Sequence, residues 1–266
     1  MTATLLIPVI VIGVLFTPNM VFSLLIALFV GRGAWEWGKL IKISRNLHQF
    51  AYILLIIFIL AIAYLFRDTS LGLVIILIGI AWWLSAFILV VLYQHQHNLT
   101  PSSKMIKAGI GLLVLVPAWM SLVLLQDLDN GPSLVLFLFI IIWTADSAAY
   151  FVGSYLGKRR FASRISPGKS WEGVIGALLV SFLVGLAYGK LTAMQDVSGG
   201  ILTLCVVTVI FSILGDLTES MFKRIANIKD SSHILPGHGG VLDRIDSLTS
   251  AAPVYVAGLY MLGEMK

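Results

Sequence analysis

Acidic and basic side chains gather between residues 216 and 247, in a chain that is otherwise poor in charge. Asp216 and Glu219 are three residues apart at the end of an apolar run, so a helix would place them on one face. Asp243 and Asp246 have the same spacing. Capping of a helix N-terminus is one explanation for the second pair, but it leaves the first unexplained. Two carboxylate faces joined by one loop could hold a hard divalent cation.

The segment between the two acidic pairs combines basic residues with glycines. Its turn reads Pro236-Gly237-His238-Gly239-Gly240. Glycines accept positive φ, so successive N–H groups can line a concavity that binds anions. Lys223, Arg224 and Lys229 precede the turn, and Arg244 follows it. We therefore predict a site for a metal-bridged polyphosphate, in which His238 organises the loop or donates to phosphate rather than acting as a general base.

Two earlier segments add charged residues to an apolar background. Asp146 interrupts the apolar run 133–153, where an ionised carboxylate costs ~2.5–3.5 kcal/mol and needs a polar surrounding. A contact between helices is the alternative explanation. The loop Ser166–Ser170 contains Gly-Lys-Ser, but Ser163 stands where a phosphate-binding P-loop needs its first glycine, and no strand is expected before it. Lys169 could still bind phosphate as a point charge.

The composition excludes a soluble globular protein. The chain has 266 residues, of which 59% are hydrophobic and 12% charged, and its mean hydropathy is +0.97. We predict an all-α, polytopic integral membrane protein with about nine transmembrane helices. The apolar runs are Leu5–Phe16, Val21–Leu40, Ala51–Phe66, Leu71–Tyr93, Met105–Leu125, Ser133–Gly153, Gly173–Gly189, Ile201–Leu217 and Leu248–Leu262. They form a single transmembrane domain, with N-terminal helices in 1–125 and catalytic helices and loops in 133–266.

The basic residues predict the orientation. Of the 18 lysines and arginines, 15 fall in or beside the connections after the second, fourth, sixth and eighth helices, which therefore face the cytoplasm. We expect both termini on the outer side. Topology explains the net charge of +5 better than a nucleic-acid partner, because no basic face with stacking aromatics accompanies it. Trp35, Glu36 and Trp37 are expected to anchor the second helix at the membrane interface rather than to take part in chemistry, and a functional role of Glu36 is the alternative.

The charged segments resemble a known family. Ser220-Met221-Phe222-Lys223-Arg224, Lys229-Asp230, the glycine-rich turn and Asp243-Arg244-Ile245-Asp246 are similar to the signature of the phosphatidate cytidylyltransferases, or CDP-diacylglycerol synthases. The resemblance implies transfer of a cytidylyl group from CTP to phosphatidic acid in phospholipid biosynthesis, with Mg²⁺ required and a second cation left open. It also implies an enzyme of the cytoplasmic (inner) membrane, with its active site facing the cytoplasm, and suggests a homodimer.

We expect the following roles for the site residues. Asp216 and Asp243 are the principal metal ligands, with Asp246 and Asp146 as further members of the acidic centre. Lys169 is expected to be catalytic through a contact with phosphate. The expected substrate-binding residues are Lys223, Arg224, Lys229, Gly237, His238, Gly239, Gly240, Arg244 and Ser166. Arg244 could instead form a structural pair with Glu219 or Asp230.

Two other functions remain open at this point. An ion-coupled transporter would use intramembrane acids for ions, but those acids would be spread through the bilayer rather than gathered beside a glycine-rich turn. A CTP-dependent polyisoprenol kinase would release CDP instead of pyrophosphate. The reaction products therefore separate the alternatives.

Overall fold

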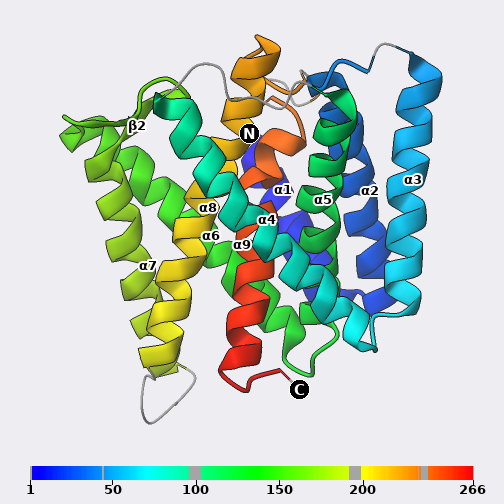
Figure 1. The fold of residues 1–266 in the computed structure, drawn as a ribbon. Helices are drawn as coiled ribbons and strands as arrows, with labels where there is room; N and C mark the ends of the chain where they lie inside the picture. Colours follow the sequence, from blue (N-terminus) through cyan, green and yellow to red (C-terminus); the bar gives the residue numbers. More distant parts are fainter. Residues whose placement is uncertain are drawn as a thin grey trace.

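The computed structural model of the chain describes residues 2–43, 45–95, 103–191, 199–232, 234 and 239–265. Within them, nine helices and one two-stranded antiparallel hairpin follow one another along the chain (Figure 1). The helices are α1 (Thr2–Phe16), α2 (Asn19–Leu40), α3 (Asn46–Leu65), α4 (Ser70–His95), α5 (Lys104–Gln126), α6 (Gly131–Leu156), α7 (Trp171–Leu191), α8 (Gly199–Ala226) and α9 (Leu242–Met261). The strands are β1 (Arg160–Ala162) and β2 (Ser166–Ser170).

The predicted all-α membrane fold is confirmed. Seven of the described helices, α2 to α8, are long and apolar enough to cross a membrane. Helix α1 has only 15 residues, which is short of the roughly 20 that a span needs. Helix α9 has 20 residues, but it carries three charged side chains near its start.

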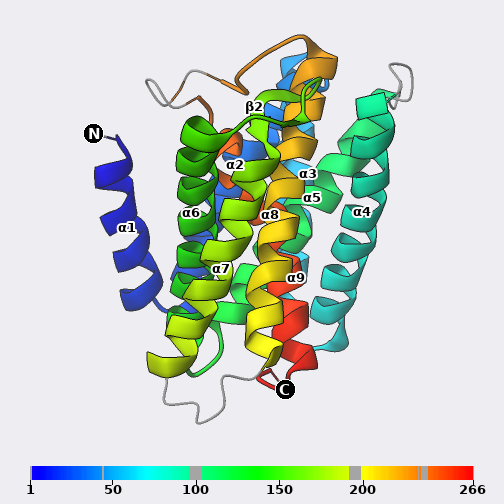
Figure 2. The ribbon, with the colours of Figure 1, turned by 90° about the vertical axis from the view of Figure 1, so that its left-hand side faces the viewer.

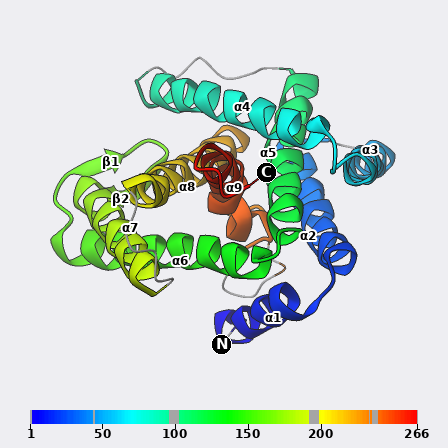
Figure 3. The same ribbon diagram turned by 90° about the horizontal axis from the view of Figure 1, so that it is seen from below.

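Helix α9 lies at the centre of the bundle, among α4, α5, α6 and α8 (Figure 3). Neighbouring helices shield it from lipid, so it can contain small and polar residues where a lipid-facing helix needs apolar ones. Ser250, Ala251 and Ala252 are fully buried in it. The Ser250 hydroxyl donates a hydrogen bond of 2.6 Å to the carbonyl oxygen of Phe211 on α8. The centre of the fold is therefore a close contact between α8 and α9.

Helix α8 continues nine residues beyond the apolar run that ends at Leu217. This last part buries Glu219, Ser220 and Lys223. The apolar run underestimates the helix because its end packs against protein, where polar side chains find partners. The charged residues of the 216–224 segment thus belong to a helix and keep helical spacing.

The hairpin β1–β2 is a feature that the sequence analysis missed. Arg160 pairs with Ser170, and Ala162 with Ser166. The expectation that no strand precedes Ser163 is therefore wrong, because β1 ends at Ala162. An antiparallel hairpin still differs from the strand, loop and helix of a P-loop. The hairpin connects α6 to α7 and also contacts α8. It carries Lys169 toward α8.

The two ends of the chain lie at opposite ends of the bundle (Figures 1 and 2). Successive helices run in opposite directions, and an odd number of such helices separates the termini. The expectation that both termini share the outer side is therefore wrong for this arrangement. The α8–α9 connection lies at the same end as the start of α1, away from the C-terminus (Figure 1).

Helices α6 and α7 pack closely through small residues. Gly173, two residues after the start of α7, lies against the backbone of α6. A Cβ atom there would come within 2.8 Å of the Ala149 carbonyl oxygen. Small residues permit this approach of two helices within a membrane.

Candidate active site

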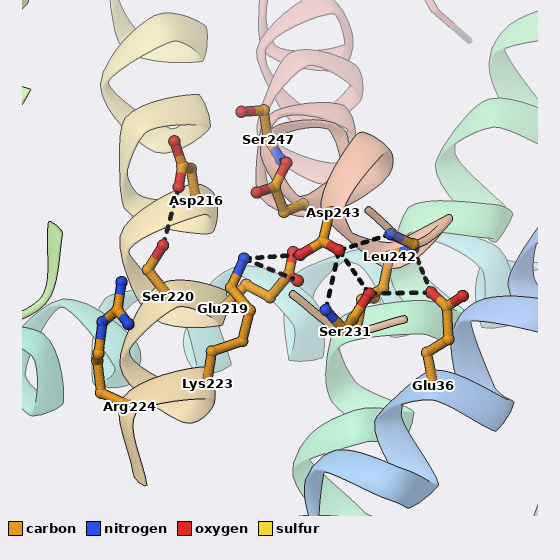
Figure 4. A network of polar contacts seen from close by, with 12 residues as sticks. Glu36, Asp216, Glu219, Ser220, Lys223, Arg224, Ser231, Leu242, Asp243 and Ser247 are labelled. Carbon is orange, nitrogen blue, oxygen red and sulfur yellow. Dashed lines mark hydrogen bonds and ion pairs between the residues drawn. The ribbon is translucent and has the colours of Figure 1, made fainter. Parts of the chain in front are cut away.

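Five charged residues of the 216–247 segment come together where α8 ends and α9 begins (Figure 4). Asp216, Glu219 and Lys223 come from α8, and Asp243 and Asp246 from the first turns of α9. Four-residue spacing on α8 places Glu219 and Lys223 on one face. The structure thus brings the end of α8 and the start of α9 together, as predicted.

Asp243 is held by several hydrogen bonds. Its Oδ1 accepts one of 2.7 Å from the Lys223 ammonium. Its Oδ2 accepts from the Ser231 amide at 2.9 Å, the Ser231 hydroxyl at 2.7 Å and the Gly240 amide at 2.7 Å. Burial raises the pKa of Asp243, but the hydrogen bonds from Lys223 and the Gly240 amide outweigh it and hold the pKa below its ordinary value. Asp243 is therefore an ionised group, and each of its oxygens accepts at least one hydrogen bond.

Lys223 is shared between two carboxylates. Besides its bond to Asp243, its Nζ lies 3.4 Å from Oε1 of Glu219, and the Glu219 side chain is only 4% exposed. The charge of Lys223 also acts on Asp216. A single ammonium group thus connects both acidic pairs.

Asp216 has a different environment. Its Oδ2 lies 2.6 Å from Nζ of Lys169, which comes from β2, and its Oδ1 accepts a 3.2 Å bond from the Ser220 hydroxyl. The Asp216 side chain is 33% exposed and that of Lys169 is 25% exposed. The hairpin therefore brings the predicted phosphate-binding lysine to the predicted metal ligand.

Asp146 and Asp246 complete an acidic group around Asp216. The charge of Asp146, on α6, interacts with those of Asp216 and Lys169, and the charge of Asp246 with those of Asp216 and Asp146. Three separate helices thus contribute one carboxylate each. The four predicted acids and Lys169 all belong to this one region.

The donor chemistry of these carboxylates fits a hard divalent cation such as Mg²⁺, which takes oxygen ligands. Among the residues that the structure describes, however, no three acidic, histidine or cysteine side chains converge as a complete metal site. Mg²⁺ commonly takes only one or two carboxylates and completes its shell with water and substrate phosphate. The metal site stays a prediction.

Other predicted residues have contacts of a different kind. Arg224 donates from Nε to the Ile165 carbonyl oxygen at 3.0 Å, which fastens the β1–β2 turn to α8. Ser166 pairs with Ala162 inside the hairpin. Lys229 and Arg244 are exposed. Gly237 and His238 lie outside the described residues.

Two glycines of the predicted anion-binding turn are described. Gly239 has φ of 75°, which only glycine adopts without strain, and a Cβ there would lie 2.7 Å from Oδ2 of Asp243. Gly240 donates its amide to the same oxygen. That amide is therefore engaged within the protein. The rest of the turn stays a predicted phosphate site.

The expectation of an interfacial anchor at the end of α2 is wrong for Glu36 and Trp37. Trp37 is 1% exposed, and its Nε1 donates to the Lys107 carbonyl oxygen at 2.9 Å. Glu36 is fully buried and contacts the α8–α9 connection (Figure 4). A charged residue inside an apolar helix indicates a polar environment within the protein. For Glu36, the two flanking tryptophans favoured a position at the membrane interface instead.

An apolar groove of about 270 Å³ lies between α2 and α3. Its lining includes Met20, Leu24, Ile57 and Trp119, and none of the predicted site residues. The polar groups at the α8–α9 junction therefore form a separate region.

Comparisons with known proteins show the family of the chain. A model described as the cytidylyltransferase family matches residues 1–262. The phosphatidate cytidylyltransferase of Pseudomonas aeruginosa is 41% identical over 98% of this chain and 96% of its own length. That of Haemophilus influenzae is 36% identical over 91% of this chain and 90% of its own length. That of Staphylococcus epidermidis is 43% identical over 47% of this chain and 48% of its own length. The chain therefore belongs to the cytidylyltransferase family.

Proposed function

We propose that this protein transfers a cytidylyl group from CTP to phosphatidic acid and forms CDP-diacylglycerol and pyrophosphate. The observation that carries the proposal is the meeting of Asp146, Asp216 and Asp246 with Lys169 and Lys223 at one end of a membrane-type helix bundle. A nucleotide from water and a lipid from the membrane can meet there. Full-length similarity to phosphatidate cytidylyltransferases supports the same reaction.

The chemistry needs positioning more than acid–base catalysis. An oxygen of the phosphatidate phosphate attacks the α-phosphorus of CTP, a new P–O bond forms, and the bond to the leaving pyrophosphate breaks. The nucleophile is already anionic, so no strong base is required. Lys169 lies where it can exchange Asp216 for a substrate phosphate, and Lys223, held by Asp243, adds a fixed positive charge beside it.

Mg²⁺ is the cofactor in this proposal. Asp216, together with Asp246 or Asp146, would hold it through one or two carboxylates, and when bound it would supply charge neutralisation for the triphosphate. Asp243 is less suited to be a principal ligand, because Lys223, Ser231 and Gly240 already occupy both of its oxygens. Its proposed part is to hold Lys223 and the glycine-rich turn in place.

The orientation and assembly are also proposals. The excess of lysine and arginine in alternate connections supports a site on the cytoplasmic side of the inner membrane. A homodimer is the assembly that we expect from the resemblance described above.

The test uses the purified protein in lipid vesicles with phosphatidic acid, Mg²⁺ and CTP labelled at either the α- or the γ-phosphorus. The α-label should enter the lipid and the γ-label should appear in pyrophosphate. A kinase would put the γ-label into the lipid and release CDP. A transporter would give ion flux without CTP consumption. Either result would contradict the proposal.

A further inference from the structure

Glu36 is a buried carboxylate in the N-terminal half of the chain, far in sequence from the acidic residues of α8 and α9. It is 0% exposed, although it lies on α2 among apolar residues. Burial of an ionised carboxylate is costly unless charged and hydrogen-bonding partners surround it. Its partners therefore indicate what the group is for.

One partner is on its own helix and the others are on the α8–α9 connection. Arg32, four residues earlier, lies 3.3 Å from Oε1. Oε1 also accepts a 2.6 Å bond from the Ser232 hydroxyl. Oε2 accepts from the Leu242 amide at 2.8 Å and lies 3.2 Å from the Ser231 hydroxyl oxygen, whose single proton goes to the nearer Asp243. Glu36 thus binds the connection on both sides of the glycine-rich turn.

These contacts lead directly to Asp243. Ser231 Oγ lies between the two carboxylates, 3.2 Å from Oε2 of Glu36 and 2.7 Å from Oδ2 of Asp243. Glu36 also accepts a hydrogen bond from the amide of Leu242, which is the first residue of α9 and the neighbour of Asp243 (Figure 4). Any displacement of Glu36 would therefore change the position of Asp243 and, through it, of Lys223.

Gly240 is fitted against the same carboxylate. A Cβ at position 240 would lie 2.5 Å from Oε2 of Glu36 and would also collide with Ser231 Oγ. Position 240 has room only for glycine because α2 supplies a carboxylate there. Gly240, Ser231 and Glu36 are therefore packed against one another.

We infer that Glu36 is a positioning residue for cytidylyl transfer: from α2 it fixes Ser231, Ser232 and the start of α9, and hence Asp243 and Lys223, in the arrangement that accepts CTP. This inference rests on the proposed function. Glu36 need not touch substrate, since its effect passes through Ser231, Ser232 and the start of α9.

The experiment compares Glu36→Gln with Gln49→Leu, a matched control. Gln49 is also a buried polar residue, and its hydrogen bond goes to the Trp35 carbonyl oxygen, next to Glu36. Glu36→Gln should lower kcat/KM for CTP by on the order of 10²-fold and leave KM for phosphatidic acid close to the wild-type value, since a small misplacement near reacting groups has effects of this size. Gln49→Leu should lower the melting temperature without this selective kinetic change.

A double-mutant cycle with Ser232→Ala tests whether Glu36 acts through the 231–242 segment. The two substitutions should affect kcat/KM for CTP less than additively, because they remove the same contact. In the absence of substrate, hydrogen exchange at the Leu242 and Ser231 amides should be faster in Glu36→Gln than in Gln49→Leu.

Unchanged exchange, or equal kinetic losses in Glu36→Gln and Gln49→Leu, would overturn the inference. A wild-type protein that forms no CDP-diacylglycerol would contradict the proposed function instead. The exchange measurement would then still decide whether Glu36 holds the segment.

Discussion

The acidic region has two parts that differ in how their carboxylates are satisfied. Asp243 has four hydrogen bonds from three residues and connects through Ser231 to the buried Glu36. Asp216 is a third exposed and is paired with Lys169, a residue on a short hairpin. The first part is built as a fixed framework. The second keeps groups that a substrate or a cation can engage, and this difference separates structural from chemical roles.

Asp216→Asn should have the largest effect on turnover. The amide keeps the shape of the side chain and an acceptor for Ser220, but it removes the charge that faces Lys169 and the proposed cation. Loss of one electrostatic element of an active site costs roughly 10²–10³ in kcat. We expect a fall of this size with little change in melting temperature, measured by incorporation of labelled CTP and by thermal unfolding. Turnover within a few-fold of wild type would remove Asp216 from the chemistry.

Asp243→Asn should damage stability as well as turnover. It leaves Lys223 with Glu219 as its close ion-pair partner among the described residues. Breaking a buried ion pair from one side costs about 3–5 kcal/mol. We therefore expect a clear fall in melting temperature together with reduced kcat. If the variant keeps the wild-type melting temperature and loses only its Mg²⁺ dependence, Asp243 is a metal ligand and the division between the two parts is wrong.

Lys169→Met should reduce use of CTP with little effect on stability. The Lys169–Asp216 pair is partly exposed, and such pairs contribute only about 0–1 kcal/mol to folding. A lost phosphate contact should lower kcat/KM for CTP by roughly tenfold or more, in line with a charge-assisted hydrogen bond. Steady-state kinetics with varied CTP provides the measurement. A loss confined to stability would assign Lys169 to the framework.

Arg224→Lys should have the smallest effect of the four. Lysine keeps the positive charge but lacks the Nε donor that binds the Ile165 carbonyl oxygen. One such hydrogen bond contributes about 0.5–1.5 kcal/mol to stability. We expect a slight fall in melting temperature and activity close to wild type. A large rise in KM for CTP would instead show that Arg224 binds phosphate with its planar guanidinium group.

Much of the fold follows from apolar runs, because membrane-type helices must be apolar over a fixed length. The run Met105–Leu125, for example, differs from α5 by one residue at each end. Apolar runs do not predict the parts of a helix that pack against protein rather than lipid. They end α8 too early at Leu217, and they assign Glu36 and Trp37 to an interface although both are buried.

The site was partly predictable for a related reason. Spacing on α8 and at the start of α9 places Asp216, Asp243 and Asp246 in one region, since helices fix local geometry. The partners of those residues come from distant segments, and sequence spacing carries no information about them. The pairing of Lys169 with Asp216 depends on a hairpin of charged and small residues, which lacks the alternating apolar pattern of a strand. Loop packing around Glu36 is likewise a tertiary property.

The close contact of α6 and α7 at Gly173 influences where the β1–β2 hairpin lies. Strand β2 ends at Ser170 and α7 starts at Trp171, so the hairpin is rigidly continuous with α7. A methyl group at position 173 would wedge α7 away from the backbone of α6 and carry the hairpin with it. The distance between Lys169 and Asp216 therefore depends on position 173, where the absence of a side chain allows α7 to pack directly against α6.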